Sequence, residues 1–479
     1  MIRIHWHSRK ICIKTSIQKY DGSQDIYATL QIQLLSFRGR LTELMTRTTD
    51  VIIIGAGVIG AAVAFELNKR GIRTLTLDRN SKAGHGSTAG SCACIRMHYS
   101  TFDGTAMAWE GYHYWRDWAD YLEASKDEPV SRLVETGCLV MKTEENGFLE
   151  SHIKNSLELN CPHEDWSTET ISRRLPIYNL QSFAPARTLD DPTFGQSNGD
   201  RLNGGVYWPN AGYVTDPALS AQNLADAASR VGGEFYLGTE VVEILTQSGK
   251  VNGVKLSTGE EIHAPIVVNV AGPASNKINA MAQVLEDMKI ATRALRQEVA
   301  HVPSPEGFDF EKDGMMVSDN DISLYCRPEH GNHILIGSED PACDAPEWID
   351  DDGNYNRDFT DQWTTQVQRY AQRVPSIGIP HRTRGLVDLY DASTNWIPIY
   401  DISSLPGFYM ACGTSGNQYK NAPIAGILMA NLIEYCEAGN DHDEKPMPLK
   451  LPYLGRTVNS GFYSRNREIN MESSFSVVG

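Results

Sequence analysis

The chain has 479 residues, of which 41% are hydrophobic and 22% charged, a composition typical of globular proteins and unlike that of collagen-like or wholly disordered chains. Its length allows two or three domains. The 43 basic side chains are outnumbered by 60 acidic ones, which gives a net charge of -17, so most of the surface would repel a phosphate backbone. We therefore do not expect nucleic acid as a partner.

The cysteines indicate a reducing environment. The chain has nine, without a Cys-x-x-Cys pair or a second Cys/His pair at zinc-site spacing. We expect free thiols, no metal site and a cytoplasmic location. No run of about 18 apolar residues is present, so we expect no membrane-spanning helix.

The N-terminal segment differs in charge from the rest of the chain. Residues 1–49 carry eight basic and only three acidic side chains, without the apolar core of a secretory signal. Met45 lies five residues before the first strong strand and would be a natural start. We expect residues 1–47 to be a disordered or misassigned extension, with organellar targeting as the alternative.

The first strong strand leads into a glycine-rich turn. Asp50–Ile54 is a β-branched run, followed by Gly-x-Gly-x-x-Gly at 55–60 and by a helix-forming segment with small residues. Gly55 allows a tight turn, Gly57 lets a pyrophosphate approach the backbone, and Gly60 lets the helix pack on the strand. The helix N-terminus would then face the phosphate charge.

A second strand supports dinucleotide binding over the alternative of a structural turn with a capping Asp. Arg73–Leu77 ends at Asp78, 23 residues after Gly55, where an acidic side chain meets a ribose hydroxyl. This carboxylate disfavours a 2′-phosphorylated nucleotide. No second complete Gly-x-Gly-x-x-Gly is present, so FAD alone is the simpler cofactor. The small-residue loop Gly84–Ser91 would let it pass close to the backbone.

Four segments together resemble the FAD-dependent amino acid and amine oxidoreductases grouped with D-amino acid oxidase. Within that group they are most similar to the monomeric sarcosine oxidase and sarcosine oxidase β-subunit branch. The segments are 51–60 with Asp78–Arg79, 86–99, 266–273 and 413–420.

The resemblance implies an α/β (α+β) fold, with a Rossmann-like FAD-binding domain and an inserted substrate domain built on a mixed or antiparallel sheet. The FAD-binding domain would be discontinuous, and the implied ranges are 48–130, 213–286 and 385–440 for it, 131–212 and 287–384 for the substrate domain, and 441–479 for a C-terminal tail. We expect substrate-domain strands at 133–140 and 333–337, a helix at 112–122 and a surface loop at 340–360.

The same resemblance implies which residues hold FAD. They are Gly55, Gly57, Val58, Ile59, Gly60, Asp78, Arg79, Gly86, Ser87, Thr88, Val242, Ala271, Gly272, Gly413, Gly416, Asn417, Gln418, Tyr419 and Lys420. The backbone of Val242 would receive the adenine, and the turn at 413–420 would lie beside the flavin pyrimidine ring. The cysteine that tethers the flavin in the monomeric branch has no counterpart in Arg384–Tyr390, so we expect non-covalent FAD.

The catalytic residues implied by the resemblance centre on a carboxylate clamp. Arg96 and Lys420 match the positions that hold the substrate carboxylate, and a guanidinium suits that role because its planar donors fit a carboxylate bidentately. His98 and Tyr99, directly after Arg96, would tune the substrate amine or shape the pocket, ahead of the further candidates His301, Tyr325 and Tyr390.

Three positions depart from the family pattern. Ala93 stands where the sarcosine oxidase branch has an arginine, and Leu295 replaces a tyrosine before an Arg-Gln pair. Gln418 replaces a glycine beside the expected flavin site. The first two departures weaken the case for sarcosine itself as the substrate.

The leading functional hypothesis is an FAD-dependent oxidase or dehydrogenase acting on a small amino acid or N-methylated amino acid. Its C–N bond would be oxidised by hydride transfer to flavin N5, giving an imine that hydrolyses, with oxygen or a redox partner as electron acceptor. The alternatives are an FAD-dependent 2-hydroxy acid dehydrogenase and a non-catalytic dinucleotide-binding subunit of a larger complex.

Overall fold

The computed structural model describes residues 3–7, 10–14, 47–143, 146 and 148–477. It divides into two compact units, Met1–Thr48 and Thr49–Gly479. The described part of the first unit holds strands β1 (Arg3–His7) and β2 (Lys10–Lys14), which pair antiparallel, and the short strand β3 (Arg47–Thr48). Most of the expected disordered extension lies outside the described residues and stays a prediction.

A six-stranded sheet in the second unit carries the glycine-rich turn. Its strand order is β12-β5-β4-β16-β24-β23, with β23 antiparallel at one edge and the other neighbours parallel. The strands are β4 (Val51–Ile54), β5 (Thr74–Asp78), β12 (Glu234–Leu237), β16 (Ile266–Asn269), β23 (Ile399–Ile402) and β24 (Phe408–Cys412). The strands expected at 50–54, 73–77 and 266–270 are confirmed to within a residue.

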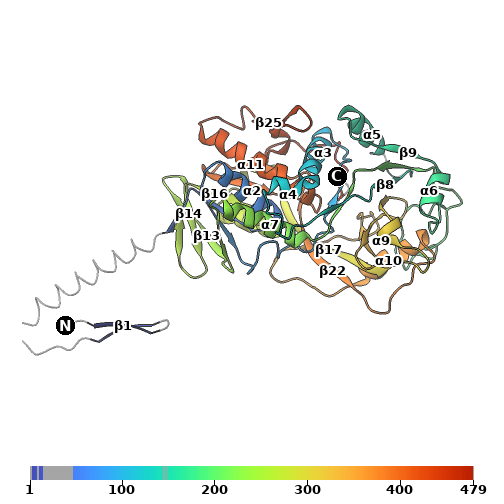
Figure 1. Cartoon of the computed structure of the whole chain (residues 1–479), viewed down its shortest axis with the longest axis horizontal. Helices are drawn as coiled ribbons and strands as arrows, with labels where there is room; N and C mark the ends of the chain where they lie inside the picture. Colours follow the sequence, from blue (N-terminus) through green and yellow to red (C-terminus); the bar gives the residue numbers. More distant parts are fainter. Residues whose placement is uncertain (1–2, 8–9, 15–46, 144–145, 147, 478–479) are drawn as a thin grey trace, which may run out of the picture. The chain divides into compact units, whose positions relative to one another are not determined.

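This sheet is covered on both faces, which explains the unbroken β-branched run of β4. Val51 and Ile53 pack against helices α2 (Val58–Lys69) and α11 (Ala422–Glu437). Ile52 and Ile54 face the opposite core, which includes the antiparallel strands β13 (Val241–Gln247), β14 (Lys250–Leu256) and β15 (Glu261–His263). Helix α7 (Pro217–Arg230) packs against α2, and Figure 1 shows α2, α7 and α11 gathered on this part of the unit.

A nine-stranded sheet forms the second framework. Its main path is β21-β17-β20-β19-β18-β8-β10-β9, and β22 pairs with β17. The strands are β8 (Cys138–Met141), β9 (Glu164–Trp166), β10 (Gly205–Trp208), β17 (Thr292–Pro303), β18 (Met316–Asp319), β19 (Leu324–Glu329), β20 (His333–Ser338), β21 (Glu347–Ile349) and β22 (Gly385–Ser393). The β18–β8 pair is parallel and the other pairs are antiparallel, so the sheet is mixed, as expected.

Helices α9 (Phe310–Asp313) and α10 (Asp361–Arg373) cover one face of the nine-stranded sheet (Figure 1). Strand β22 belongs to this sheet, although it begins the third segment expected for the FAD-binding domain. The assignment of whole segments to a cofactor domain and a substrate domain stays a prediction.

The strand expected over 133–140 is two strands, so that prediction was wrong. Leu133–Val134 forms β7, which pairs with β11 (Gly212–Val214); β11 also pairs with β6 (Cys94–Ile95). Gly137 separates β7 from β8 with φ of +74°, a conformation that turns the chain and that favours glycine. Gly137 itself was the one local signal of this turn.

The helix expected at 112–122 is also interrupted. Helix α3 (Phe102–Arg116) is followed by the short α4 (Trp118–Tyr121), and Asp117 between them leaves the helical conformation. Trp115 and Trp118 are 1% and 3% exposed and stack with their ring centroids 4.2 Å apart, which confirms their place in the core.

The second unit contains further helices, strands and 3-10 turns. They are α5 (Leu149–Glu158), α6 (Thr168–Arg174), α8 (Ser275–Met281), β25 (Pro448–Leu451), β26 (Arg456–Asn459) and the single 3-10 turns η1 (Gly272–Ala274), η2 (Leu285–Asp287), η3 (Tyr419–Asn421) and η4 (Ser460–Tyr463). None of the described helices has the length and apolar character needed to cross a membrane. Eight cysteines, from Cys92 to Cys436, are free thiols, and the described residues hold no cluster of three or more His, Cys, Asp or Glu side chains suited to a metal.

Candidate cofactor and substrate site

A cavity in the second unit is lined by residues from both large sheets. One group of lining residues, called the cofactor end below, consists of the predicted cofactor residues of the β4–α2 turn, the end of β5, the loop after it and the turn after β16. A second group, called the substrate end below, consists of Arg96, His98 and the turn that contains Gly416–Lys420. The residues expected to line this cavity do so, except for Tyr99, Val242 and Gly413.

The three exceptions lie close to the cavity wall. Val242 is 43% exposed, whereas its neighbour Val241 lines the cavity. Gly413 donates its backbone N–H to the buried Asp391 carboxylate at 2.6 Å and so supports the turn from behind. Whether the Val242 backbone receives an adenine stays a prediction.

The glycine-rich turn is packed so tightly that side chains are excluded from two of its positions. A Cβ on Gly60 would lie 1.9 Å from the Gly55 carbonyl oxygen, and one on Gly55 would lie 2.2 Å from the Val270 oxygen. A Cβ on Gly57 would meet only the Thr88 hydroxyl oxygen, at 3.1 Å, which leaves the backbone of this turn open toward the cavity. This cradle fits the approach of a dinucleotide phosphate to the N-terminus of α2.

Asp78 ties the turn to the end of β5. Its Oδ2 accepts the Ala56 backbone N–H at 2.7 Å, and its Oδ1 accepts the Asn80 backbone N–H at 2.7 Å. Asp78 also lines the cavity. Next to it, Arg79 forms an ion pair with Asp352 at 2.6 Å.

The loop around Asp352 was expected to be a surface loop, and this prediction was incomplete. Residues 340–360 include β21, and Asp352, Tyr355 and Arg357 line the cavity. Asp352 is only 7% exposed, because its partner Arg79 holds it against the cofactor end of the cavity. A sequence rich in Asp and Pro is typical of loops in general and does not reveal such a long-range contact.

Arg96 is a buried cation held by backbone oxygens. It is 8% exposed, and its two terminal nitrogens donate to the carbonyls of His98 and Val477, each at 2.7 Å. Its guanidinium lies over the Tyr99 ring, 4.4 Å from the centroid. Since these partners carry no negative charge, the positive charge of Arg96 is left for an anion in the cavity.

Lys420 and Tyr99 form a second buried group at the same end. The Lys420 ammonium donates to the Tyr99 hydroxyl at 2.8 Å and to the Asn417 carbonyl at 2.6 Å, and Tyr99 itself donates to that carbonyl at 2.8 Å. Burial, helped by the charge of Arg96, lowers the pKa of Lys420 well below its ordinary value. Tyr99 therefore positions Lys420 from outside the cavity lining.

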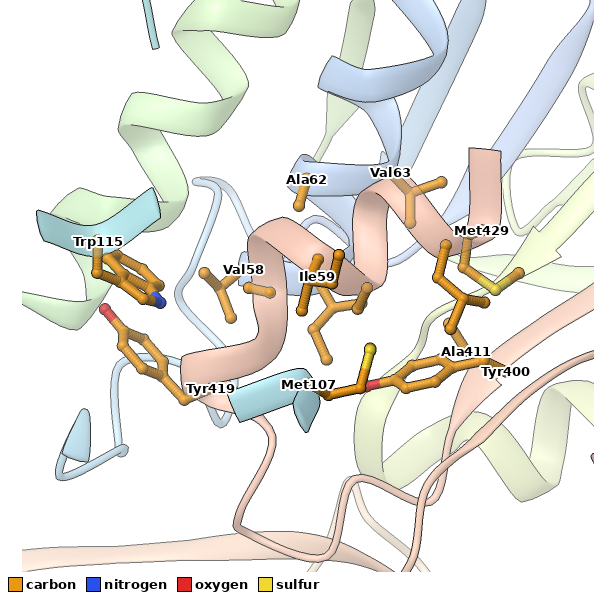
Figure 2. Packing of buried hydrophobic residues seen from close by; sticks show 14 of the residues in the cluster. Val58, Ile59, Ala62, Val63, Met107, Trp115, Tyr400, Ala411, Tyr419 and Met429 are labelled. Carbon is orange, nitrogen blue, oxygen red and sulfur yellow. The ribbon is translucent and has the colours of Figure 1, made fainter. Parts of the chain in front are cut away.

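The hydrophobic core fixes the turn that carries Lys420. Trp115 of α3 donates its indole N–H to the Lys420 carbonyl at 2.7 Å, and its ring stacks on Tyr419 with centroids 5.2 Å apart. Figure 2 shows these two rings side by side where the turn enters α11. Position 420 is thus set by packing as well as by hydrogen bonds.

His98 lines the cavity but has an apolar setting. It is 1% exposed, neither ring nitrogen has a hydrogen-bond partner among the described residues, and its ring lies 4.4 Å from Trp208. Burial lowers its pKa well below the ordinary histidine value, with the charges of Arg96, His152 and Lys420 acting in the same direction. A neutral imidazole at this place can shape the pocket or accept a hydrogen bond.

Other cavity residues come from the nine-stranded sheet. Of the further aromatic candidates, Tyr325 and Tyr390 line the cavity and His301 does not. Sequence reasoning did not single out as cavity residues Gln297, Ser318, Asp388, Cys138 and Cys326 of this sheet, nor Cys92 and Cys94, which lie just before and on β6. The alternation of inward- and outward-facing residues along each strand could have indicated these positions. Which distant strands pair with each other could not be predicted from the sequence.

The comparisons with known proteins define the class. The family model DAO, described as FAD dependent oxidoreductase, matches residues 50–432. The chain belongs to this family of FAD-dependent oxidoreductases, which confirms the resemblance expected from its sequence and the expected cofactor.

The individual similarities are distant but extend over most of the chain. The chain is 25% identical to glycine oxidase of Geobacillus kaustophilus over 83% of its length and 96% of the relative. It is 23% identical to sarcosine oxidase subunit beta of Rhodobacter capsulatus over 80% and 84% of the two chains. The structure of L-proline dehydrogenase from P. horikoshii aligns with a TM-score of 0.68 at 19% identity, covering 88% of this chain and 98% of that one, which shows a shared fold.

Proposed function

We propose that this protein oxidises the C–N bond of a small amino acid or N-methylated amino acid. The observation that carries the proposal is the pair of buried basic side chains, Arg96 and Lys420, which reach the same cavity as the dinucleotide cradle from segments more than 300 residues apart. A substrate carboxylate between them would favour the charged form of Lys420, whose pKa burial and Arg96 lower. Two basic side chains at one end of a partly enclosed cavity suit a substrate carboxylate. The relatives named for glycine, sarcosine and proline support a substrate of this size and charge.

Different segments of the chain would bind the cofactor and the substrate. We propose that the turn 55–60, Asp78, Arg79 and the loop 86–88 hold FAD, together with the turns at 271–272 and 416–420. When bound, FAD supplies a hydride acceptor. Arg96 and Lys420 would orient the substrate carbon toward it, while the enclosing apolar and aromatic walls exclude water. The six-stranded sheet would thus carry the cofactor, and the nine-stranded sheet would close the substrate end.

The free thiols support a reducing compartment, and we propose the cytoplasm. An electron acceptor, either oxygen or a redox partner, would complete the cycle.

An anaerobic absorbance screen tests the substrate class. Purified protein with FAD is mixed with small amino acids, N-methylated amino acids and matched 2-hydroxy acids, and bleaching of the flavin band is followed. Bleaching by amino acids with release of ammonia or methylamine is the expected result. Bleaching by hydroxy acids alone would support the 2-hydroxy acid reaction, and no bleaching with any compound would support a non-catalytic subunit.

A further inference from the structure

A buried serine–glutamate pair faces the substrate end of the cavity without any role in the proposed clamp. Ser318 lies on β18, is 7% exposed and lines the cavity. Its hydroxyl donates to Glu339 Oε1 at 2.5 Å. Glu339 follows β20 directly, is 5% exposed, and its Oε2 has no hydrogen-bond partner among the described residues.

The register of the nine-stranded sheet explains why this pair lies on the cavity side. Tyr325 pairs with Ser318 on one side and with Gly337 on the other, so these three positions share a face of the sheet. Tyr325 lines the cavity, and its ring lies over Gly337, where a Cβ would be 2.3 Å from the ring. Glu339 is two residues beyond Gly337, and alternate residues point to the same face.

The charges around Glu339 set when it can accept a proton. Burial raises the pKa of Glu339 to about 8; the Ser318 hydrogen bond and Arg96 lower it, and Asp319 and Asp340 raise it. The charge of this carboxyl group also raises the pKa of the Cys138 thiol, on β8. Glu339 is therefore neutral below this pKa and anionic above it, and an ammonium group arriving nearby would favour the anion.

We propose that Ser318 and Glu339 take the proton from the substrate amine and so select amines over hydroxy acids. This rests on the proposed function. The substrate N–H⁺ bond breaks as its proton passes to Ser318 Oγ, and the Ser318 hydroxyl proton passes to Glu339 Oε1, which becomes a carboxylic acid. No electrons are exchanged. The amine is left with the lone pair that C–N oxidation requires, while Arg96 and Lys420 hold the carboxylate of the same zwitterion.

In this arrangement Ser318 touches the substrate and Glu339 acts through Ser318. A 2-hydroxy acid brings no ammonium group, so above the pKa of Glu339 the buried carboxylate would remain an unpaired charge beside it. Arg96 and Lys420 cannot recognise the substrate nitrogen. Ser318 and Glu339 would provide this recognition.

The test is the pH dependence of anaerobic flavin reduction in the FAD-loaded protein, with the amino acid that best bleaches the parent. We expect Glu339→Gln and Ser318→Ala to slow reduction about a hundredfold just above pH 8, where Glu339 is a carboxylate that can accept a proton and the free substrate is still an ammonium. Both variants should recover most of the parent rate at still higher pH, where the free substrate is already a neutral amine. Glu347→Gln is the matched control on the same sheet, because its carboxylate is 47% exposed and Arg296 keeps Glu298 as a partner; it should follow the parent profile.

Three results would overturn parts of this account separately. If the parent is not reduced by any amine, the proposed function fails. If the parent is reduced and both variants keep its pH profile, Ser318 and Glu339 take no proton. If the variants bind FAD normally but are slowed equally at every pH, the pair only supports the fold, and the proposal is wrong.

Discussion

Arg96 combines burial with uncharged partners, which is unusual for a structural arginine and suited to a ligand anion. The carbonyl of Val477 occupies one of its terminal nitrogens, and that of His98 the other. Buried arginines elsewhere in the chain are neutralised, as Arg373 is by Asp319 and Asp321. A substrate carboxylate that replaces the Val477 carbonyl would give Arg96 the charge partner that it lacks.

Removing either cation of the clamp should therefore lower activity without removing the cofactor. We expect Arg96→Met and Lys420→Met to keep a yellow flavin spectrum and to lose about thirtyfold or more in kcat/KM, since truncating a buried charge contact costs roughly 2 to 5 kcal/mol. The decisive measurement compares the substrate with its amide. The parent should discriminate strongly against the amide, and Arg96→Met should discriminate much less; equal ratios would remove Arg96 from carboxylate recognition.

Asp78 is expected to act on the cofactor in two ways, through the ribose and through the two backbone N–H groups that it holds. Asp78→Ala should weaken FAD binding about tenfold to a hundredfold, because charge-assisted hydrogen bonds contribute roughly 1.5 to 3 kcal/mol. Retention of FAD is measured after dialysis. Asp78→Asn, which keeps one acceptor oxygen, should be intermediate, and normal turnover at saturating FAD is expected for both. Unchanged retention in Asp78→Ala would contradict the ribose role.

At the level of elements, local sequence signals predicted the β4–α2 turn and β5, because each is specified by neighbouring residues. Arg96, His98 and the Gly416–Lys420 turn were predicted from the family resemblance, and all of them line the cavity. The positions of Ser318 and Gln297, which were not predicted, depend on the pairing of β17, β18 and β19, which no short pattern specifies. The break at Gly137 shows the same limit, since it depends on a single backbone conformation.

The glycines of the β4–α2 turn should respond differently to the same substitution. Gly60→Ala places a Cβ 1.9 Å from a backbone oxygen, so it should destabilise both the apoprotein and the holoprotein by about 1 to 3 kcal/mol. Gly57→Ala meets only a side-chain hydroxyl at 3.1 Å and has an ordinary φ of -69°, so the apoprotein should keep its stability while FAD affinity falls. Thermal melts with and without FAD measure both effects. A Gly57→Ala protein that binds FAD like the parent would show that the cofactor does not approach this backbone.

Across the whole second unit, two sheets of different construction meet at one cavity. The parallel sheet brings the carboxyl ends of β4, β5 and β16 together, which is where ligands bind in such sheets. The mixed sheet lines the other side and contributes Gln297, Ser318, Tyr325 and Tyr390 to it. Four thiols, from Cys92, Cys94, Cys138 and Cys326, line this enclosed space.

These thiols bear on how the cofactor is held, because a cysteine near the flavin can be a site of covalent attachment. Burial raises the pKa of Cys92 to about 12 and that of Cys326 to about 11, and it raises the pKa of Cys94 and Cys138 as well. The thiolate is the reactive form of cysteine, so these side chains are poor nucleophiles at neutral pH. Neither they nor the cysteine-free segment 384–390 provides a reactive tether.

We therefore expect FAD to be bound without a covalent link, so that acid precipitation releases all the yellow colour into the supernatant. The pellet, dissolved in denaturant, should show no flavin fluorescence, and the supernatant should contain FAD in the amount present before precipitation. Fluorescence that stays with the polypeptide would contradict this expectation. The same measurement on Cys92→Ser, Cys94→Ser, Cys138→Ser and Cys326→Ser would then identify the attachment site, because only the variant that lacks the tether would release its flavin.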